Sequence, residues 1–66
     1  MSWSQVSRDT IVNGDYYITR TRSAHGWYYN GWKGKHDDRD LREHIDAGWN
    51  LDAVKGACER HAVEGK

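Results

Sequence analysis

Two arginines and two aromatic residues have the types and the spacing of a binding surface. Arg20 and Arg22 are separated by one residue, and so are Trp27 and Tyr29. If each pair belongs to a β-strand, its alternate side chains share a face, and guanidinium groups beside rings form cation–π contacts. Such residues are typical of protein-binding hot spots and of sites that stack single-stranded nucleic acid. The simpler interpretation is cross-strand packing, with arginine stems covering the rings and charged groups in water.

The expected partner-binding surface adds two lysines to this cluster. Ten Lys and Arg residues balance ten Asp and Glu residues, so no global field attracts nucleic acid or anionic lipid. A partner protein is therefore the leading interpretation, a nucleic acid bound by the same residues is the alternative, and a homodimer that pairs aromatic surface is a third. The expected surface comprises Arg20, Arg22, Trp27, Tyr29, Lys33 and Lys35.

Histidine, cysteine and aspartate residues raise the question of a metal site, and their spacing argues against one. Structural zinc sites normally show two closely spaced ligand pairs, whereas this chain has one such pair, Cys58 and His61. Cys58 also belongs to an apolar stripe, where a free thiol packs as a small hydrophobic group. We expect no metal and no cofactor. The other candidates lie in or near an acidic segment: His36, Asp37, Asp38 and His44.

Catalysis is not expected from these residues. A cysteine nucleophile needs an adjacent base and an exposed, electropositive setting, and a buried helix position gives Cys58 neither. His25 falls in a predicted loop, where acid–base chemistry requires a formed pocket. The segment at 37–40, three aspartates and one arginine, favours a solvated helix start over paired catalytic carboxylates. A chain of 66 residues rarely encloses a pocket of the usual ligand volume.

The first half of the chain has the pattern of an antiparallel meander that positions the candidate surface. Asn13 and Gly14 separate two β-prone runs, which is the strongest short-range signal of a hairpin with a type I′ turn. Alternating bulky and hydroxyl residues follow, then a short polar connection and an aromatic run. The sequence predicts strands at 10–12, 16–22 and 27–33, a connection over 23–26, and a candidate fourth strand at 3–6.

Aromatic residues fall on both faces of this predicted sheet. A single helix can cover only one face, so we expect the other face to expose aromatic surface and to carry the binding residues. The register follows by counting outward from the connection, because side chains alternate between the faces. It pairs Arg22 with Trp27, Arg20 with Tyr29, Ile18 with Gly31 and Tyr17 with Trp32.

The second half of the chain has the pattern of two helices. Asn50 is a favourable N-cap for a helix over Leu51–Ala62, whose apolar residues recur at helical spacing. Before it, the sequence predicts a short helix over Arg39–Ala47. This short helix would have Asp38 as its cap, Leu41 and Ile45 as apolar contacts four residues apart, and Gly48 after its end.

These two helices together fit a helix-turn-helix loosely. The second helix, however, presents a mixture of acidic and basic residues with no net attraction to phosphate, whereas DNA binding draws much of its strength from basic contacts. DNA recognition by this pair is therefore a weaker interpretation.

The composition indicates one small folded domain over residues 1–66. Four Trp and four Tyr supply the large apolar surface that a disordered chain lacks. One cysteine excludes an internal disulfide, and with no visible secretory signal or spanning apolar run it indicates the reducing cytoplasm. The expected fold class is α+β: a three- to four-stranded antiparallel sheet packed against a C-terminal helix, with a short helix before it.

Two stretches resemble short phage and prophage proteins in which an aromatic β-meander precedes a helix. They are the aromatic stretch over 16–34 and the helix over Leu51–Ala62. The layout is also similar to the three-strand DNA-binding domains of some integrases and plant transcription factors. This chain differs from both in its acidic segment over 36–48, and its sheet lacks their basic excess.

The phage resemblance implies a non-enzymatic function in the host cytoplasm. Members of that group with known roles often bind a host protein stoichiometrically, and they include inhibitors of CRISPR effectors. The resemblance therefore implies an accessory protein of a phage or mobile element. Its partner would be a host protein or nucleoprotein complex, which it inhibits or redirects.

Overall fold

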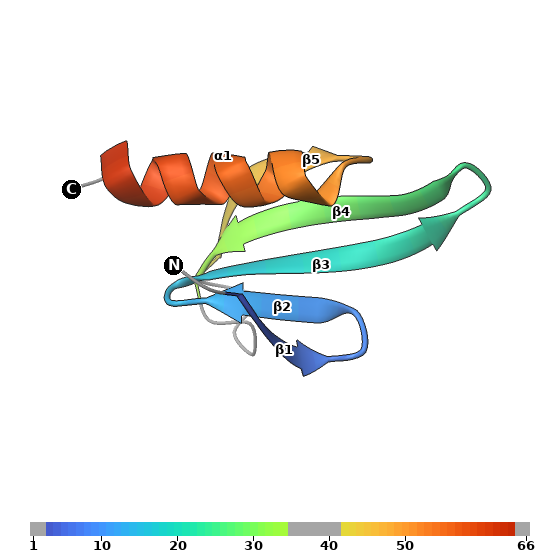
Figure 1. The fold of residues 1–66 in the computed structure, drawn as a ribbon, viewed down its shortest axis with the longest axis horizontal. Coiled ribbons are helices and arrows are strands. Elements are labelled where there is room, and N and C mark those ends of the chain that lie inside the picture. The colour runs from blue at the N-terminus through green and yellow to red at the C-terminus, as the bar shows by residue number, and fades with distance from the viewer. Residues whose placement is uncertain (1–2, 35–41, 65–66) are drawn as a thin grey trace.

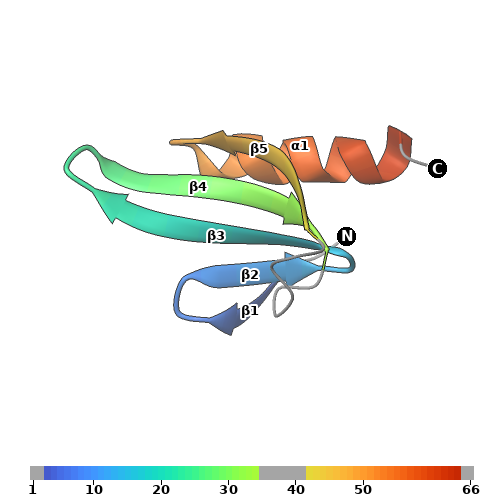
Figure 2. The same cartoon turned by 180° about the vertical axis from the view of Figure 1, so that it is seen from behind.

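A five-stranded antiparallel sheet carries one helix on one of its faces (Figure 1). The computed structural model describes residues 3–34 and 42–64. The strands follow one another across the sheet in chain order, and the helix packs mainly against the last two strands (Figures 1 and 2). The elements are β1 (Ser4–Ser7), β2 (Thr10–Asn13), β3 (Tyr16–Ser23), β4 (Gly26–Lys33), β5 (Glu43–Gly48) and α1 (Leu51–Glu64).

The α+β class and the candidate N-terminal strand are confirmed, but the sheet has five strands rather than the expected three to four. The β2–β3 hairpin forms where the sequence predicts it, with its loop one residue later. Asn13 pairs with Tyr16, so Gly14 and Asp15 are the two central turn residues. Gly14 has a φ of 62°. Glycine with positive φ at the first central position is the pattern of a type II′ turn rather than the expected type I′.

The predicted register of β3 and β4 is confirmed at all four predicted pairs, from Arg22 with Trp27 to Tyr17 with Trp32. The connection is shorter than expected, because Ser23 pairs with Gly26 and leaves only Ala24 and His25 between the strands. The Ser23 hydroxyl donates a hydrogen bond of 3.0 Å to the carbonyl of Gly26, and the His25 amide donates one of 3.3 Å to the Ser23 hydroxyl. These hydrogen bonds stabilise the two-residue loop.

The predicted short helix over Arg39–Ala47 is wrong. Residues 43–48 form the edge strand β5, while its expected cap Asp38 and its contact Leu41 lie outside the described residues. β5 pairs with β4, and Ile45 is the extra residue of a bulge that packs against the core. Pairing with β5 satisfies backbone hydrogen-bonding groups along β4, which would remain unpaired if this segment formed a separate short helix. Because this helix is absent from residues 43–48, the helix-turn-helix interpretation is also wrong.

The predicted C-terminal helix is confirmed and extends to Glu64. Asn50 caps it, because its side-chain oxygen accepts hydrogen bonds from the amides of Asp52 at 2.9 Å and Ala53 at 3.3 Å. The apolar stripe of α1 faces the sheet. Its fully buried side chains are Val54 and Cys58, each 1% exposed.

The helix packs directly against the sheet at Gly31. A Cβ atom at this position would lie 2.8 Å from Sγ of Cys58 and 2.9 Å from Cγ1 of Val54. Ile18, the register partner of Gly31, is buried under the same part of the helix. The face that carries Ile18 and Gly31 is therefore the covered face of the sheet.

A series of polar side-chain contacts links the C-terminal turns of α1 to the sheet. The Tyr16 hydroxyl lies 2.7 Å from Nδ1 of His61, and Nε2 of His61 lies 3.5 Å from a carboxylate oxygen of Glu43. Both ring nitrogens of His61 are therefore engaged, Nδ1 in a hydrogen bond with the Tyr16 phenol and Nε2 in a close polar contact with the Glu43 carboxylate. These contacts connect β3, α1 and β5.

We expect Tyr16→Phe to lower the free energy of unfolding by about 1 kcal/mol, because it removes the phenol partner of a part-buried ring nitrogen. Tyr29→Phe is the matched control, since the Tyr29 hydroxyl makes no hydrogen bond within the described residues. Urea unfolding followed by far-UV circular dichroism measures both. Equal stability losses in the two variants would contradict the linking role of the Tyr16 hydroxyl.

Cys58 makes the stability of the fold depend on pH in the alkaline range. Burial, and after it the carboxylates of Asp46 and Glu59, raise the pKa of this thiol from 9.0 to about 11. The unfolded chain therefore ionises first, so the thiol stabilises the fold fully below pH 9.0 and ceases to do so as the pH rises through about 11. The stability advantage of the wild type over Cys58→Ala should shrink by about 2 kcal/mol between pH 8 and pH 11. An advantage that is constant with pH would contradict this prediction.

Candidate functional site

The binding residues predicted from the sequence lie on the covered face of the sheet. Arg20 and Tyr29 form the next same-face pair after Ile18 and Gly31, and Arg22 and Trp27 form the one after that. The expectation that these residues occupy the uncovered face is therefore wrong. Its physical reason is Gly31, whose missing side chain lets the helix pack on this side.

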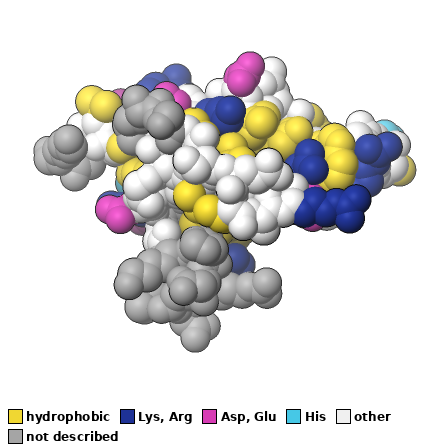
Figure 3. Space-filling view, turned by 60° about the horizontal axis from the view of Figure 1, so that its bottom comes forward, with side chains coloured by type: hydrophobic (Ala, Val, Ile, Leu, Met, Phe, Trp, Pro, Cys, Tyr) yellow, Lys and Arg dark blue, Asp and Glu magenta, His cyan; other side chains and the backbone are white. Residues whose placement is uncertain are grey.

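The cluster nevertheless stays accessible, because the β3–β4 hairpin projects past the N-terminal end of α1 (Figure 1). Arg22 is exposed, and its three neighbours are half-buried. Figure 3 shows Lys and Arg side chains beside hydrophobic surface at this end of the molecule. We call this the hairpin-end surface; it consists of Arg20, Arg22, Trp27 and Tyr29.

Both arginines of the hairpin-end surface contact one indole ring. The guanidinium carbon of Arg20 lies 4.2 Å from the centroid of the Trp27 ring, and that of Arg22 lies 5.2 Å from it. Each distance falls within the range of a cation–π contact. The predicted cation–π arrangement is confirmed, with Trp27 as its centre.

The two arginines differ in how firmly they are held. Arg20 donates from Nε to the carboxylate of Asp9 at 3.0 Å and from its terminal nitrogen to the carbonyl of Arg8 at 3.2 Å. Its charge is therefore balanced, and its side chain is fixed by the loop between β1 and β2. Arg22 makes no salt bridge with any described residue. Arg20 positions the ring, and Arg22 offers the available charge.

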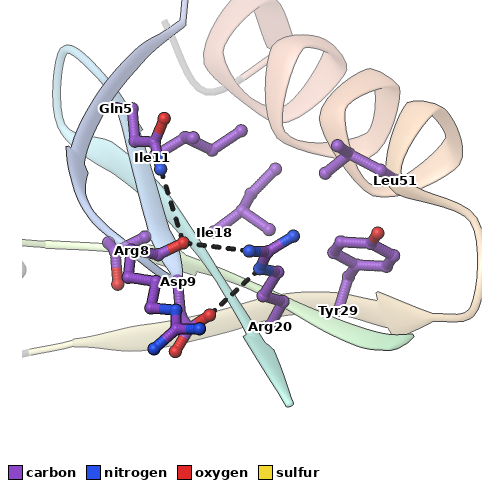
Figure 4. Close-up of a pocket in the computed structure, with 9 residues that line it drawn as sticks. Gln5, Arg8, Asp9, Ile11, Ile18, Arg20, Tyr29 and Leu51 are labelled. Carbon is purple, nitrogen blue, oxygen red and sulfur yellow. Dashed lines mark hydrogen bonds and ion pairs between the residues drawn. The ribbon is translucent and has the colours of Figure 1, made fainter. Parts of the chain in front are cut away.

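A surface groove of about 310 Å³ begins beside Arg20. It lies between the β1–β2 hairpin and the first turn of α1 (Figure 4). Its volume is at the lower end of small-molecule pockets, which suits a single side chain of a partner. Ile11, Ile18 and Leu51 make its apolar part. Its polar and aromatic part includes Gln5, Arg8, Asp9, Arg20 and Tyr29.

The two predicted lysines do not join this cluster. Lys33 pairs with Tyr16 and Glu43 at the opposite end of β4, about 13 Å along the strand from Tyr29. Lys35 lies outside the described residues. The structure thus brings four of the six predicted residues together.

The face opposite α1 carries a second aromatic group, next to the buried ring of Tyr17. The predicted alternation of side chains already places Tyr28 and Trp32 on this face, whereas sequence reasoning missed the residues that join them from β5 and its ends. Arg42 lies over the Trp32 ring, with its guanidinium carbon 3.8 Å from the centroid, and His44 meets the same ring edgewise at 4.8 Å. Trp49 meets Tyr28 edgewise at 4.9 Å and is 54% exposed. We call this the open-face surface; it consists of Tyr28, Trp32, Arg42, His44 and Trp49.

The candidate metal ligands that the structure describes are not assembled. Cys58 is buried in the core, and His61 is engaged with Tyr16 and Glu43. His44 lies on the other face of the sheet, against Trp32. Over residues 3–34 and 42–64 no three His, Cys, Asp or Glu side chains come close enough to hold a metal ion. His36, Asp37 and Asp38 lie outside these ranges.

Comparisons with known proteins give no relative for this arrangement. No family model, no curated protein and no solved structure matches the chain. Within the described residues, α1 is the only helix, and it is neither long nor apolar enough to span a membrane.

Proposed function

We propose that this protein is a non-enzymatic binding module that recognises a partner protein through the hairpin-end surface. In keeping with the resemblance of its sequence, we further propose that it is an accessory protein of a phage or mobile element. It would act in the host cytoplasm, where it binds a host protein or complex and inhibits or redirects it. Inhibition of a defence complex such as a CRISPR effector is the specific form that we favour.

The observation that carries this proposal is the Trp27 ring contacted by two arginines at a projecting end of the sheet. Trp, Tyr and Arg are the residues that dominate protein-binding energy. The salt bridge between Arg20 and Asp9 fixes part of the cluster in advance, so less conformational entropy is lost on binding.

The charges of the cluster favour a protein over a nucleic acid at this surface. Arg20 is paired with Asp9, so Arg22 is the single uncompensated cation among the four residues, which is enough for one acidic side chain and too few to neutralise successive phosphates. The adjacent groove has the volume of a side chain and an apolar part formed by Ile11, Ile18 and Leu51. The partner chemistry that fits is a carboxylate near an aliphatic or aromatic side chain.

Affinity capture from a bacterial host lysate tests this function with matched bait proteins. The baits are the wild type, Arg22→Ala, and Arg60→Ala, which removes an exposed arginine from α1. We expect mass spectrometry to identify a protein that the wild type and Arg60→Ala retain and that Arg22→Ala loses. Nuclease treatment and moderate salt should leave it bound. No such protein, or one released by nuclease, would overturn the proposal.

A further inference from the structure

The open-face surface has the chemistry of a stacking platform. Trp32 is oriented by a hydrogen bond of 3.2 Å from its indole nitrogen to the Thr19 hydroxyl, and it lies nearly parallel to Tyr17 with 22° between the rings. The guanidinium of Arg42 covers the Trp32 ring while its side chain remains exposed. Arg42 therefore presents a second planar surface, held in place by the indole beneath it.

A second stacking position lies farther along the same strand. Tyr28 and Trp32 are four residues apart on β4, which places them on one face about 13 Å from each other. Trp49 extends the Tyr28 position, and His25 meets Trp49 edgewise at 6.3 Å. Between the two positions, the side-chain oxygen of Asn30 lies 3.4 Å from Nε2 of His44. Amide and imidazole groups of this kind hydrogen-bond base edges.

Within the described strands, no carboxylate lies on the open face. The two strand carboxylates, Glu43 and Asp46, pair in register with Lys33 and Gly31, so both lie on the face of α1. Among the described residues, Arg42 is the charged side chain of the open face, and its titratable rings are Tyr17, Tyr28, His44 and, at the hairpin loop, His25. A polyanion with planar groups complements such a face, whereas a cationic or hydroxyl-rich ligand would require acceptor carboxylates.

We propose that the open-face surface binds single-stranded nucleic acid. One base stacks on the guanidinium plane of Arg42 above Trp32, and another stacks on Trp49 beside Tyr28. Asn30 and His44 contact the edges of the intervening nucleotides. Stacking supplies most of the affinity and phosphate contacts supply little, because Arg42 is the single permanent cation of the open-face surface.

Fluorescence anisotropy with labelled oligonucleotides of about 12 residues tests this site. Oligothymidylate and oligouridylate distinguish DNA from RNA, and a duplex of equal length is the comparison. We expect the wild type to bind at least one single strand more tightly than the duplex. The slope of log K against log salt should be about −1, because few phosphates are neutralised.

Variants on the two faces locate the binding. Trp49→Ala and Arg42→Ala should each weaken single-strand binding about fivefold or more, while Arg22→Ala on the hairpin-end surface should leave it within about twofold. Arg42→Ala alone decides the question if circular dichroism shows that Trp49→Ala disturbs the fold. The proposal is overturned if the wild type binds neither strand, if duplex binds equally well, or if Arg22→Ala weakens binding as much as Arg42→Ala.

Discussion

Replacing Gly31 with valine is expected to remove a large part of the stability of this fold, about 3 kcal/mol. The first added carbon would already lie 2.8 Å and 2.9 Å from two buried atoms of α1, and valine adds two further methyl groups. Overpacking of a filled core typically costs about 1–3 kcal/mol. A domain of 66 residues has only about 3–10 kcal/mol in total.

Gly56→Ala is the matched control, because a Cβ atom at Gly56 meets nothing within 4 Å. It should raise stability by roughly 0.5–1 kcal/mol through helix propensity. Urea unfolding followed by tryptophan fluorescence and circular dichroism gives both values. Equal stability of Gly31→Val and the wild type would show that α1 does not seat against this glycine.

Trp27→Ala is expected to weaken binding to the captured partner about thirtyfold or more, which corresponds to about 2 kcal/mol. The substitution removes the ring that both arginines contact. Without this ring, Arg22 loses its support, while Arg20 keeps its salt bridge to Asp9. Isothermal titration calorimetry with the purified partner measures the loss.

Trp49→Ala is the control for this prediction. It removes an equally large, 54% exposed ring from the other face of the sheet. Its affinity for the protein partner should stay within about twofold of the wild type. If Trp49→Ala weakens protein binding more than Trp27→Ala does, then the partner docks on the open face and the hairpin-end surface is not the site.

Much of the sheet could be predicted because local signals determine it. The short loop between β3 and β4 and the alternation of side chains fix every pair from Tyr17 with Trp32 to Arg22 with Trp27. The cap at Asn50 and the stripe that includes Val54 likewise determine where α1 begins and which side it buries. These features depend on neighbours in the sequence.

β5 could not be predicted in the same way, because its stability comes from its neighbour. Glu43, Asp46 and Ala47 have low strand propensity, and the spacing of Leu41 and Ile45 fits a helical turn. Pairing with the free edge of β4 outweighs both signals. The loss of this strand from the prediction also hid Arg42 and His44 as parts of the open-face surface.

The covered face was assigned wrongly although the sequence held a relevant signal. Glycine inside a strand marks a place where another segment approaches closely, and Gly31 shares a face with Ile18 and Tyr29 by counting alone. Taken together, these residues predict the seat of the helix. The projection of the hairpin past α1 depends on where Asn50 starts the helix relative to the sheet, which only the three-dimensional arrangement reveals.

Fluorine NMR of fluorotryptophan-labelled protein tests the central claim most directly. The four indoles mark separate places: Trp3 near Glu59, Trp27 at the hairpin end, and Trp32 and Trp49 on the open face. Four Trp→Phe variants assign the signals, and the purified partner protein is then added. We predict that the Trp27 signal shifts and that the Trp49 signal does not. A shift of Trp3 or Trp49 with Trp27 unchanged would contradict the assignment of the binding surface.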